Sequence, residues 1–340
     1  MEIYPITQWT GHRDAVYALA VDAEGYPVSA GGDGTAVAWD PLQPAAPGRA
    51  LFRLPGIIYS LLPPSPLNAG WLAGGRNGSL HFVNPKPGPI PLGHPLDSTT
   101  AFHPTAHSGE PPANSMAVTT GAAPIHDLQT MNGSLWSAHG DGRLLRWSTG
   151  GRFPTPEADI PLSQSAIRCI APHPAAPYLA TGSSDGKVRL CNTRGEIVRE
   201  FTGHTLSVFS LLFLAGGKYL LSGSRDAHLA VWETESGQLL DRFPAHMGTL
   251  NHLVHLPEPG LLASAGRDKE IRLWDALTLE LRHVIGRGHY PQQAHTHSVN
   301  RLLWLPRFQF LVSAGDDRKI RVWQLGPTNP PGLQVGVAAP

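Results

Sequence analysis

The chain has 340 residues, and its 37 Gly and 33 Pro leave little room for long helices but suit many short strands joined by tight turns. Its 26 basic and 26 acidic residues cancel, so no overall field draws it to nucleic-acid phosphates or to an anionic membrane. Two cysteines, Cys169 and Cys191, cannot form a disulfide framework, and the longest apolar run, residues 208–216, is about half of a bilayer span. We therefore expect a folded, all-β, cytoplasmic protein that does not cross a membrane.

The first segment, IYPITQW at residues 3–9, has the character of a single unpaired strand. After it, VYALAV at residues 16–21 alternates with the period of two that is typical of a half-buried strand. Asp33-Gly34 then supplies a hairpin-turn dipeptide that favours positive φ. These elements predict a small antiparallel sheet whose third strand ends near Trp39.

This unit contains a small residue, an aspartate four positions later and a tryptophan six positions after that, and the pattern recurs along the chain. The five intact copies are Ser29/Asp33/Trp39, Ser137/Asp141/Trp147, Ser222/Asp226/Trp232, Ser264/Asp268/Trp274 and Ser313/Asp317/Trp323. Two altered copies keep the spacing, namely Ala73/Asn77/Val83 and Thr181/Asp185/Cys191, with Cys191 as a buried replacement for Trp. Successive copies end 41 to 64 residues apart, which indicates seven stacked units of about 40 to 45 residues.

Two dipeptides frame the units. Gly-His opens them at 11–12 and 203–204, and Trp-Asp closes a third strand at 39–40 and 274–275. With seven copies in register, the chain resembles the WD-repeat (WD40-repeat) β-propeller family over nearly its whole length. The resemblance implies an all-β, seven-bladed β-propeller with four-stranded antiparallel blades. It also implies that residues 3–9 complete the last blade and close the ring, so that no open edge remains between the first and last blades.

We expect a single propeller over residues 1–326. The approximate blades are 11–53, 54–92, 118–162, 163–202, 203–244, 245–286, and 289–325 together with 3–9. An insertion at 84–115, rich in Pro, Gly, His and Ser, is expected to form a surface loop between the second and third blades, with room for a short strand at 89–92. It is either a tolerated insertion or an arm that contacts a partner. Residues 327–340 are expected to be a flexible tail.

The recurring Ser, His and Asp raise the possibility of a hydrolase, since a base-activated hydroxyl is an acyl-transfer nucleophile. Catalysis needs one such constellation at one pocket, whereas this one is repeated. In the family that the chain resembles, these groups form a hydrogen-bond chain from the turn Asp to His, from His to Ser or Thr, and from the hydroxyl to the Trp indole. We therefore assign a structural role to the five intact copies, to Thr181 and Asp185, and to His12, His204, His246 and His295.

Units two, three and four depart from this pattern. Leu54, Gly121 and Ser163 occupy the place of the histidine. We expect the hydrogen-bond networks of these blades to be partial or absent, and the blades to be less rigid than the others.

The 17 histidines also raise the question of a metal site. No cluster of Cys or carboxylates completes a recognisable set of zinc ligands, and four of the histidines belong to the structural chain. We expect neither a metal nor another cofactor.

The resemblance implies that partners bind on one narrow face of the ring, the top face. Side chains beside the inward residue of each first strand, and the side chain just before each turn Asp, project there. From these places we select Tyr17, Tyr59, Arg76, His126, Arg168, Phe209, Arg225, Asn251, Arg267, Asn300 and Asp316 as partner-binding residues. Aromatic side chains and Arg are the types most enriched at interface hot spots, and Arg matches carboxylate and phosphate geometry. The alternative is that these residues merely solvate the rim.

The sequence thus predicts a non-catalytic interaction scaffold that binds a protein or peptide, with an acidic or phosphorylated segment held on the top face. We expect a monomer outside such complexes and no nucleic-acid partner. Two alternatives stay open. One is an enzyme with a pocket at the mouth of the channel, either a hydrolase, a lyase or a metal-dependent enzyme. The other is a nucleic-acid platform that uses the same arginines.

Overall fold

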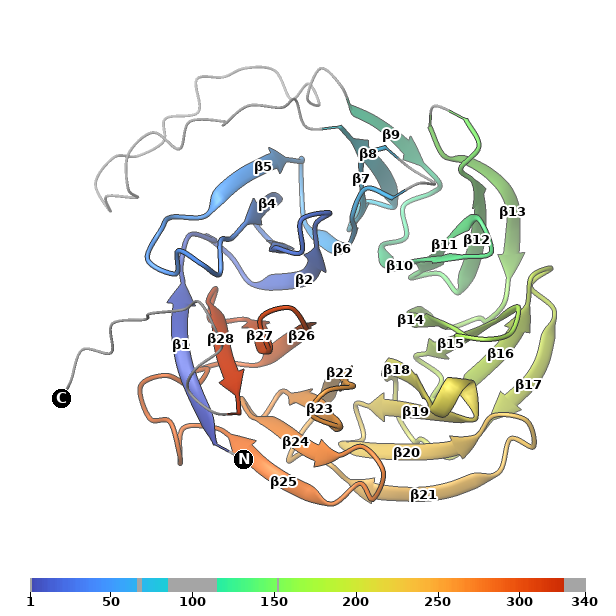
Figure 1. Ribbon diagram of the computed structural model, residues 1–340. Coiled ribbons are helices and arrows are strands. Elements are labelled where there is room, and N and C mark those ends of the chain that lie inside the picture. Colours follow the sequence, from blue (N-terminus) through green and yellow to red (C-terminus); the bar gives the residue numbers. More distant parts are fainter. Residues whose placement is uncertain (1, 66–68, 85–114, 152, 327–340) are drawn as a thin grey trace.

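The structure is a computed structural model that describes residues 2–65, 69–84, 115–151 and 153–326. These residues form seven antiparallel sheets of four strands, arranged radially as the blades of a closed ring (Figure 1). The expected seven-bladed propeller is therefore confirmed. The described part of the chain contains no helix with the length and apolar character needed to span a bilayer.

The strands of each blade follow one another along the chain, from the inner edge outward, except in blade 7. Blades 1 to 3 comprise β2 (Val16–Val21), β3 (Pro27–Gly31), β4 (Thr35–Ala38) and β5 (Arg49–Arg53); β6 (Ile58–Leu62), β7 (Trp71–Gly75), β8 (Ser79–Val83) and β9 (Ser115–Thr119); and β10 (Ile125–Met131), β11 (Ser134–His139), β12 (Arg143–Ser148) and β13 (Thr155–Pro161). Blades 4 and 5 comprise β14 (Ile167–Pro172), β15 (Tyr178–Ser183), β16 (Val188–Asn192) and β17 (Ile197–Phe201); and β18 (Val208–Leu214), β19 (Tyr219–Ser224), β20 (His228–Glu233) and β21 (Leu239–Pro244), with a short 3-10 turn at Ala215–Gly217. Blades 6 and 7 comprise β22 (Leu250–Leu256), β23 (Leu261–Gly266), β24 (Ile271–Asp275) and β25 (Leu281–Ile285); and β26 (Val299–Leu305), β27 (Phe310–Gly315), β28 (Ile320–Leu325) and β1 (Ile3–Trp9).

Blade 7 is completed by the beginning of the chain. Strand β1 pairs antiparallel with β28, from Ile3 opposite Leu325 to Trp9 opposite Ile320, and Figure 1 shows the two strands side by side. The ring closure expected from the sequence is confirmed. Trp9 is 3% exposed and its ring stacks on that of Trp39 in blade 1, with centroids 5.4 Å apart. This contact ties the closing strand to the first blade.

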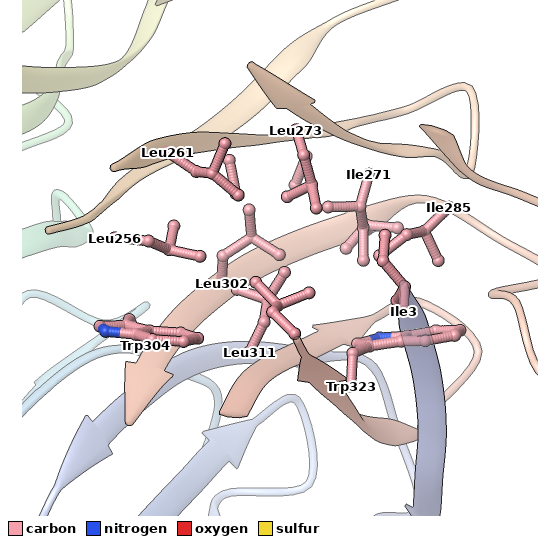
Figure 2. Packing of buried hydrophobic residues seen from close by; sticks show 14 residues of the cluster. Ile3, Leu256, Leu261, Ile271, Leu273, Ile285, Leu302, Trp304, Leu311 and Trp323 are labelled. Carbon is pink, nitrogen blue, oxygen red and sulfur yellow. The ribbon is translucent and has the colours of Figure 1, made fainter. Parts of the chain in front are cut away.

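The hydrophobic core lies between neighbouring blades, whose sheets pack face to face. Figure 2 shows the cluster between blades 6 and 7, where leucines and isoleucines of blade 6 meet Trp323 and Leu311 of blade 7. Both of these side chains are fully buried. Alternate residues of a strand point to opposite faces, so each blade contributes side chains to two such clusters. Removing this apolar surface from water is the main force that holds the blades together.

Each innermost strand carries the same irregularity. Immediately after a buried first residue, the register with the second strand shifts by one, which leaves an extra residue opposite a single partner. Such a β-bulge bends the strand and re-aims one side chain. The seven bulged residues are Tyr17, Tyr59, His126, Arg168, Phe209, Asn251 and Asn300.

The insertion corrects one part of the expected blade boundaries. Strand β9 pairs with β8, with Ser115 opposite Val83 and Thr119 opposite Ser79. The long segment therefore joins the third and fourth strands of blade 2 and does not separate blades 2 and 3. Blade 2 extends to residue 119, past the expected end at 92, and the first strand of blade 3 begins at Ile125, so residues 118 and 119 do not belong to blade 3. A strand needs only a short alternating run, and SMAVT at 115–119 supplies one beyond the Pro-rich stretch.

The remaining expectations for this region concern residues outside the described part of the chain. These are the short strand at 89–92, nearly all of the insertion at 84–115, and the tail at 327–340.

Candidate partner-binding surface

Four blades contain the complete chain of polar groups that the repeats predict. In blade 1, the Trp39 indole N–H donates to Ser29 Oγ (2.8 Å), which lies 2.7 Å from His12 Nε2. His12 Nδ1 is 3.0 Å from Asp33 Oδ2. Since Nδ1 faces a carboxylate, it carries the proton, and Nε2 accepts the serine hydroxyl. The same three contacts join His204, Asp226, Ser222 and Trp232 in blade 5, His246, Asp268, Ser264 and Trp274 in blade 6, and His295, Asp317, Ser313 and Trp323 in blade 7.

The tryptophans of these networks combine a hydrogen bond to serine with packing in the hydrophobic core. Trp232 and Trp274 each donate the indole N–H to a serine, at 2.8 and 2.9 Å, but both rings also belong to the hydrophobic core. Trp232 is 1% exposed and lies 5.7 Å from the ring of Phe201 in blade 4. Trp274 is 5% exposed and lies 5.5 Å from the ring of Phe243 in blade 5. Trp232 and Trp274 therefore bond to a serine of their own blade and also pack that blade against the preceding one.

Burial decides what the serine hydroxyls can do. The contacts of Ser29 are those of a nucleophile, a base and an orienting acid, but Ser29 is 0% exposed. Its counterparts in blades 5, 6 and 7 are equally buried. A nucleophile must meet its substrate, and no substrate can reach a hydroxyl packed inside a blade. Each hydroxyl instead satisfies an indole and an imidazole that would otherwise be buried without a partner.

Blades 3 and 4 build their networks from side chains that the sequence pattern did not indicate. In blade 3, His139 Nε2 lies 2.8 Å from Ser137 Oγ, which also accepts the Trp147 indole N–H. The imidazole thus comes from two residues after the serine. In blade 4, Arg189 donates to Asp185 (2.6 Å) and to Ser183 Oγ (3.2 Å). A search for buried donors next to the hydroxyl strand, and not only at the Gly-His position, would have found both.

Blade 2 has the least complete network. Asn77 Oδ1 accepts the Ser79 N–H, but Ser60 Oγ and His81 Nδ1 are buried without a hydrogen-bond partner in the described part of the chain. Burial lowers the pKa of His81, so its imidazole is neutral at physiological pH. Apolar side chains such as Trp71 and Val83 supply the packing of this blade.

The two sets of residues expected on the top face meet at one end of the ring. In every blade, the N–H of the residue before the turn Asp or Asn donates to the carbonyl two residues before the bulge, at 2.8 to 3.1 Å. These pairs are Gly32 to Ala15, Arg76 to Ile57, Gly140 to Pro124, Ser184 to Ala166, Arg225 to Ser207, Arg267 to Thr249 and Asp316 to Ser298. The turn is tight, since the residue after its Asp or Asn has a left-handed φ in all seven blades, for example Gly34 at +70°.

The bulged residues lie around the axis of the ring, and five of them are linked by side-chain contacts. All seven are half-buried. The rings of Tyr17 and Tyr59 lie 5.4 Å apart, and those of Tyr59 and His126 lie 5.7 Å apart. Arg168 Nη1 then donates to His126 Nε2 (3.1 Å), and its guanidinium lies 5.7 Å from the centroid of the Phe209 ring. Five adjacent blades thus share one aromatic and cationic wall, and we use the name collar for all seven bulged residues.

Asn251 and Asn300 complete the collar differently. Asn251 Nδ2 donates to Ser298 Oγ and to Val299 O, both at 2.8 Å. Asn300 Nδ2 donates to Asp316 Oδ1 (2.7 Å) and to Val16 O (3.1 Å). Their amide donors therefore hold blade 6 to blade 7 and blade 7 to blade 1.

Comparison with known proteins identifies the repeats. A family model described as "WD domain, G-beta repeat" (WD40) matches residues 3–40, 157–192, 195–233, 237–275 and 288–324, which together are more than half of the chain. The chain belongs to the WD40 family. The matched stretches omit residues 41–156, which contain the second blade and the first three strands of the third blade, where the usual histidine is absent from its place.

Individual relatives match shorter stretches of this WD40 protein. GID complex subunit 7 from Schizosaccharomyces pombe is 39% identical over 82 residues, which are 23% of this chain and 16% of that protein. COMPASS component SWD3 from Saccharomyces cerevisiae is 31% identical over 106 residues, 31% of this chain and 34% of that protein. The chain thus spans about a third or less of these relatives. The crystal structure of the WD40 β-propeller domain of Doa1 covers 96% of this chain and 97% of its own with a TM-score of 0.75, and at 18% identity it shares the fold.

The arginines of the top face of the WD40 ring are not held in ion pairs by the described residues. Arg76, Arg168, Arg225 and Arg267, which we call the top-face arginines, have no carboxylate within 4.0 Å in the described part of the chain. The arginines in ion pairs all lie on third or fourth strands; these are Arg143, Arg146, Arg189, Arg242, Arg272, Arg282 and Arg321. Nine further described arginines also lack an ion pair, namely Arg13, Arg49, Arg53, Arg194, Arg199, Arg287, Arg301, Arg307 and Arg318. Arg76, Arg225 and Arg267 are also exposed.

Sequence reasoning missed the residues that follow the bulges. Asp127 Oδ2 accepts the Ile170 N–H of the next blade (2.9 Å), and Ser210 Oγ accepts the Leu253 N–H of the blade after its own (2.9 Å). These side chains satisfy backbone donors at the inner edge of the neighbouring blade. Burial raises the pKa of Asp127, and the charge of Arg301 opposes that effect. The only signal in the sequence was a polar residue at a repeated position, two places after the buried first residue of the innermost strand.

The described residues contain no group of three or more His, Cys, Asp or Glu side chains arranged to hold a metal ion. His295 is engaged with Asp317 and Ser313 in the blade 7 network.

Proposed function

We propose that this WD40 propeller is a non-catalytic scaffold that binds a partner protein through the collar and the top-face arginines. The observation that carries the proposal is the position of four arginines without a carboxylate partner among the described residues, at the same end of the ring as the collar. Guanidinium groups form bidentate hydrogen bonds with carboxylates and phosphates, and half-buried aromatic rings supply apolar area. An acidic or phosphorylated segment that crosses blades 2 to 6 meets both.

The assemblies to which two relatives belong support a protein partner. One is a subunit of the GID complex and the other is a component of COMPASS, so both are described as parts of assemblies. We infer the same kind of role for this chain, as a monomer that joins a complex. We also infer a cytoplasmic location, since Cys169 and Cys191 are both free thiols.

Structural use of the repeated Ser, His, Asp and Trp residues is part of the same proposal. The serines that lie closest to a hydrolase-like geometry have no exposed surface, which favours a role in locking the blades over a role in acyl transfer. The nucleic-acid alternative relies on the same arginines. It differs in that oligonucleotides would compete with the protein partner, and the competition would weaken steeply as salt is raised.

Affinity capture tests the proposal. The immobilised Arg225→Glu/Arg267→Glu variant should recover the partner from a native extract at least about tenfold less well than the wild type, because each reversal replaces attraction with repulsion. Its melting temperature should stay within about 2 °C of the wild type, because exposed substitutions change stability little.

Arg194→Glu/Arg307→Glu is the matched control. It makes the same change in charge in turns at the opposite end of the ring, after β16 and after β26, and both residues are exposed. This control should capture the partner as the wild type does. Equal recovery by the two double variants would remove the top face from the account.

A further inference from the structure

Arg168 differs from the other top-face arginines because the protein fixes its guanidinium in place. Nε donates to Ser184 Oγ (2.8 Å) and Nη1 donates to His126 Nε2 (3.1 Å), while the Phe209 ring lies 5.7 Å from the guanidinium carbon. A guanidinium has five N–H donors, so two are used here and three remain for a ligand. A donor that is already fixed loses little conformational freedom when it binds.

The group that holds Arg168 does not neutralise it. His126 must be unprotonated to accept from Nη1, and burial together with the Arg168 charge lowers the pKa of His126 to about 4. Ser184 carries no charge. At neutral pH Arg168 is therefore positively charged, and none of the described residues places a carboxylate within 4.0 Å of it to balance that charge.

A second unbalanced charge lies close to the first. Arg225 occupies the pre-Asp position of blade 5, where its N–H is held by Ser207 O, and its side chain is exposed. Ser207 Oγ in turn donates to Ser184 O (3.5 Å), and Ser184 is the residue whose hydroxyl holds Arg168. Burial lowers the pKa of Arg168, and the neighbouring charge of Arg225 lowers it further. Two cations side by side without an anion repel one another, and a bound anion relieves this repulsion. The turn aspartates of blades 4 and 5 are already engaged, since Asp185 accepts from Arg189 (2.6 Å) and Asp226 Oδ2 lies 2.9 Å from His204 Nδ1. The other acids of this face, Asp14 and Asp316, belong to blades 1 and 7.

The chemistry of the two guanidiniums favours one kind of anion. A carboxylate has a single charge and two oxygens, which one guanidinium satisfies in a bidentate pair. A phosphate monoester has about −1.5 to −2 charges at pH 7 and three acceptor oxygens, so it can bridge two guanidiniums. A phosphodiester, as in nucleic acid, has one charge spread over two free oxygens and lacks the third acceptor.

We propose that Arg168 and Arg225 form a phosphate subsite, and that the segment bound on the top face presents a phosphorylated side chain there. This inference rests on the proposed function and specifies its ligand. Tyr59, in contact with His126 on the other side from Arg168, supplies apolar surface for the residue next to the phosphorylated one.

Degenerate peptide pools test the subsite. Three nine-residue pools with random flanks carry phosphoserine, glutamate or serine at the centre, and their binding to the purified chain is measured by fluorescence anisotropy at physiological salt. The phosphoserine pool should bind at least about tenfold more tightly than the glutamate pool, as expected for a bridging dianion. A single-stranded oligonucleotide with internal phosphodiesters should compete with it poorly.

Variants locate the effect. Arg168→Lys keeps the charge but loses the fork, and Arg225→Gln loses the charge; each should reduce the preference for phosphoserine over glutamate to less than about twofold. Arg76→Gln and Arg267→Gln, matched changes on the same face, should keep the preference. A melting curve for each variant shows that the fold is intact.

The possible results separate the subsite from the wider proposal. Equal binding of the phosphoserine and glutamate pools, with both lost in Arg225→Glu/Arg267→Glu, would overturn the phosphate subsite and leave the acidic-segment proposal standing. A preference that survives in Arg168→Lys and Arg225→Gln, or strong competition by the oligonucleotide, would also overturn the subsite. Absence of binding by any pool up to about 1 mM, the weak end of measurable affinity, would overturn it as well. Failure of the wider proposal shows instead as undiminished capture by the charge-reversed variant.

Discussion

Removal of residues 1–9 is expected to cost at least about 5 kcal/mol of unfolding free energy, because the variant loses the whole of β1. Ile3 and Trp9 are both buried, and truncation of a buried Trp alone costs about 3–5 kcal/mol. The outer edge of β28 would also lose its backbone pairing. Since domains of this kind are stable by about 5–15 kcal/mol, the truncated chain should lose its cooperative thermal transition, as followed by circular dichroism.

Two controls make this result specific to ring closure. Pro5→Ala changes an exposed residue of the same strand and should melt within about 2 °C of the wild type. A synthetic peptide of residues 1–12, added in excess to the truncated chain, should restore the transition by pairing with β28. If the truncated chain melted like the wild type, β1 would not be the closing strand.

Asp317→Ala is expected to cost about 3–5 kcal/mol, because it breaks a buried charged network. Asp317 Oδ1 lies 2.9 Å from His295 Nδ1, and Oδ2 lies 3.6 Å from Arg321 Nη2; the side chains of Asp317 and Arg321 are each 3% exposed. Without the carboxylate, an imidazole and a guanidinium stay buried and unbalanced. Urea unfolding measures the loss. Asp141→Ala is the matched change in blade 3, where the aspartate is 40% exposed and pairs with a partly exposed Arg143, and it should cost less than about 1 kcal/mol.

The same aspartate gives the network a pH dependence. Burial alone would raise the pKa of Asp317, but the hydrogen bond with His295 and the neighbouring positive charge outweigh burial and lower the pKa to about 2. A carboxyl whose pKa is lower in the folded state stabilises the fold above its ordinary pKa of 3.8, and this contribution disappears as the pH falls toward 2. The difference in stability between wild type and Asp317→Ala should therefore shrink between pH 4 and pH 2. A difference that stayed constant over this range would contradict the assigned contacts.

Much of the fold follows from local spacing in the sequence. The Ser-Asp-Trp spacing repeats because a tight turn and the third strand bring the hydroxyl and the indole together, and Ser29 and Trp39 do so at 2.8 Å. The closing strand was predictable because IYPITQW has no partner among its own neighbours. The fourth strand of blade 2 was not predictable, since a strand can pair across any length of inserted chain, and Ser115–Thr119 has no spacing relation to Val83.

The tryptophans show where spacing stops being informative. The repeat places Trp232 and Trp274 beside a serine of their own blade, and that contact is local. Their packing against Phe201 and Phe243 joins two blades, and the repeat spacing contains no information about which side chain of the preceding blade meets each ring. The polar half of their role could therefore be read from the sequence, whereas the core half required the structure.

For the candidate surface, too, part of the arrangement could be predicted from the sequence and part could not. The places of the collar residues could be read from the repeat, and the bulges put them at one end of the ring. What the sequence could not show is which donors remain free. Asn300 looks as available as Arg168, yet its amide is used by Asp316 and Val16 O. Likewise, His139 and Arg189 take the role that the Gly-His histidine has in other blades. They do so through contacts between strands, which follow from the three-dimensional packing and not from spacing.

Hydroxyl-radical footprinting of the captured complex tests the central claim most directly, because it reports which side chains a partner covers. The half-buried rings of Tyr17, Tyr59 and Phe209 report on the collar, and Leu42 and Leu277, which are 47% and 95% exposed in turns at the opposite end, serve as internal references. We predict that partner binding strongly reduces oxidation of the three rings and leaves the two leucines unchanged. Protection of the leucines with full oxidation of the rings would contradict the assignment of the top face as the binding surface.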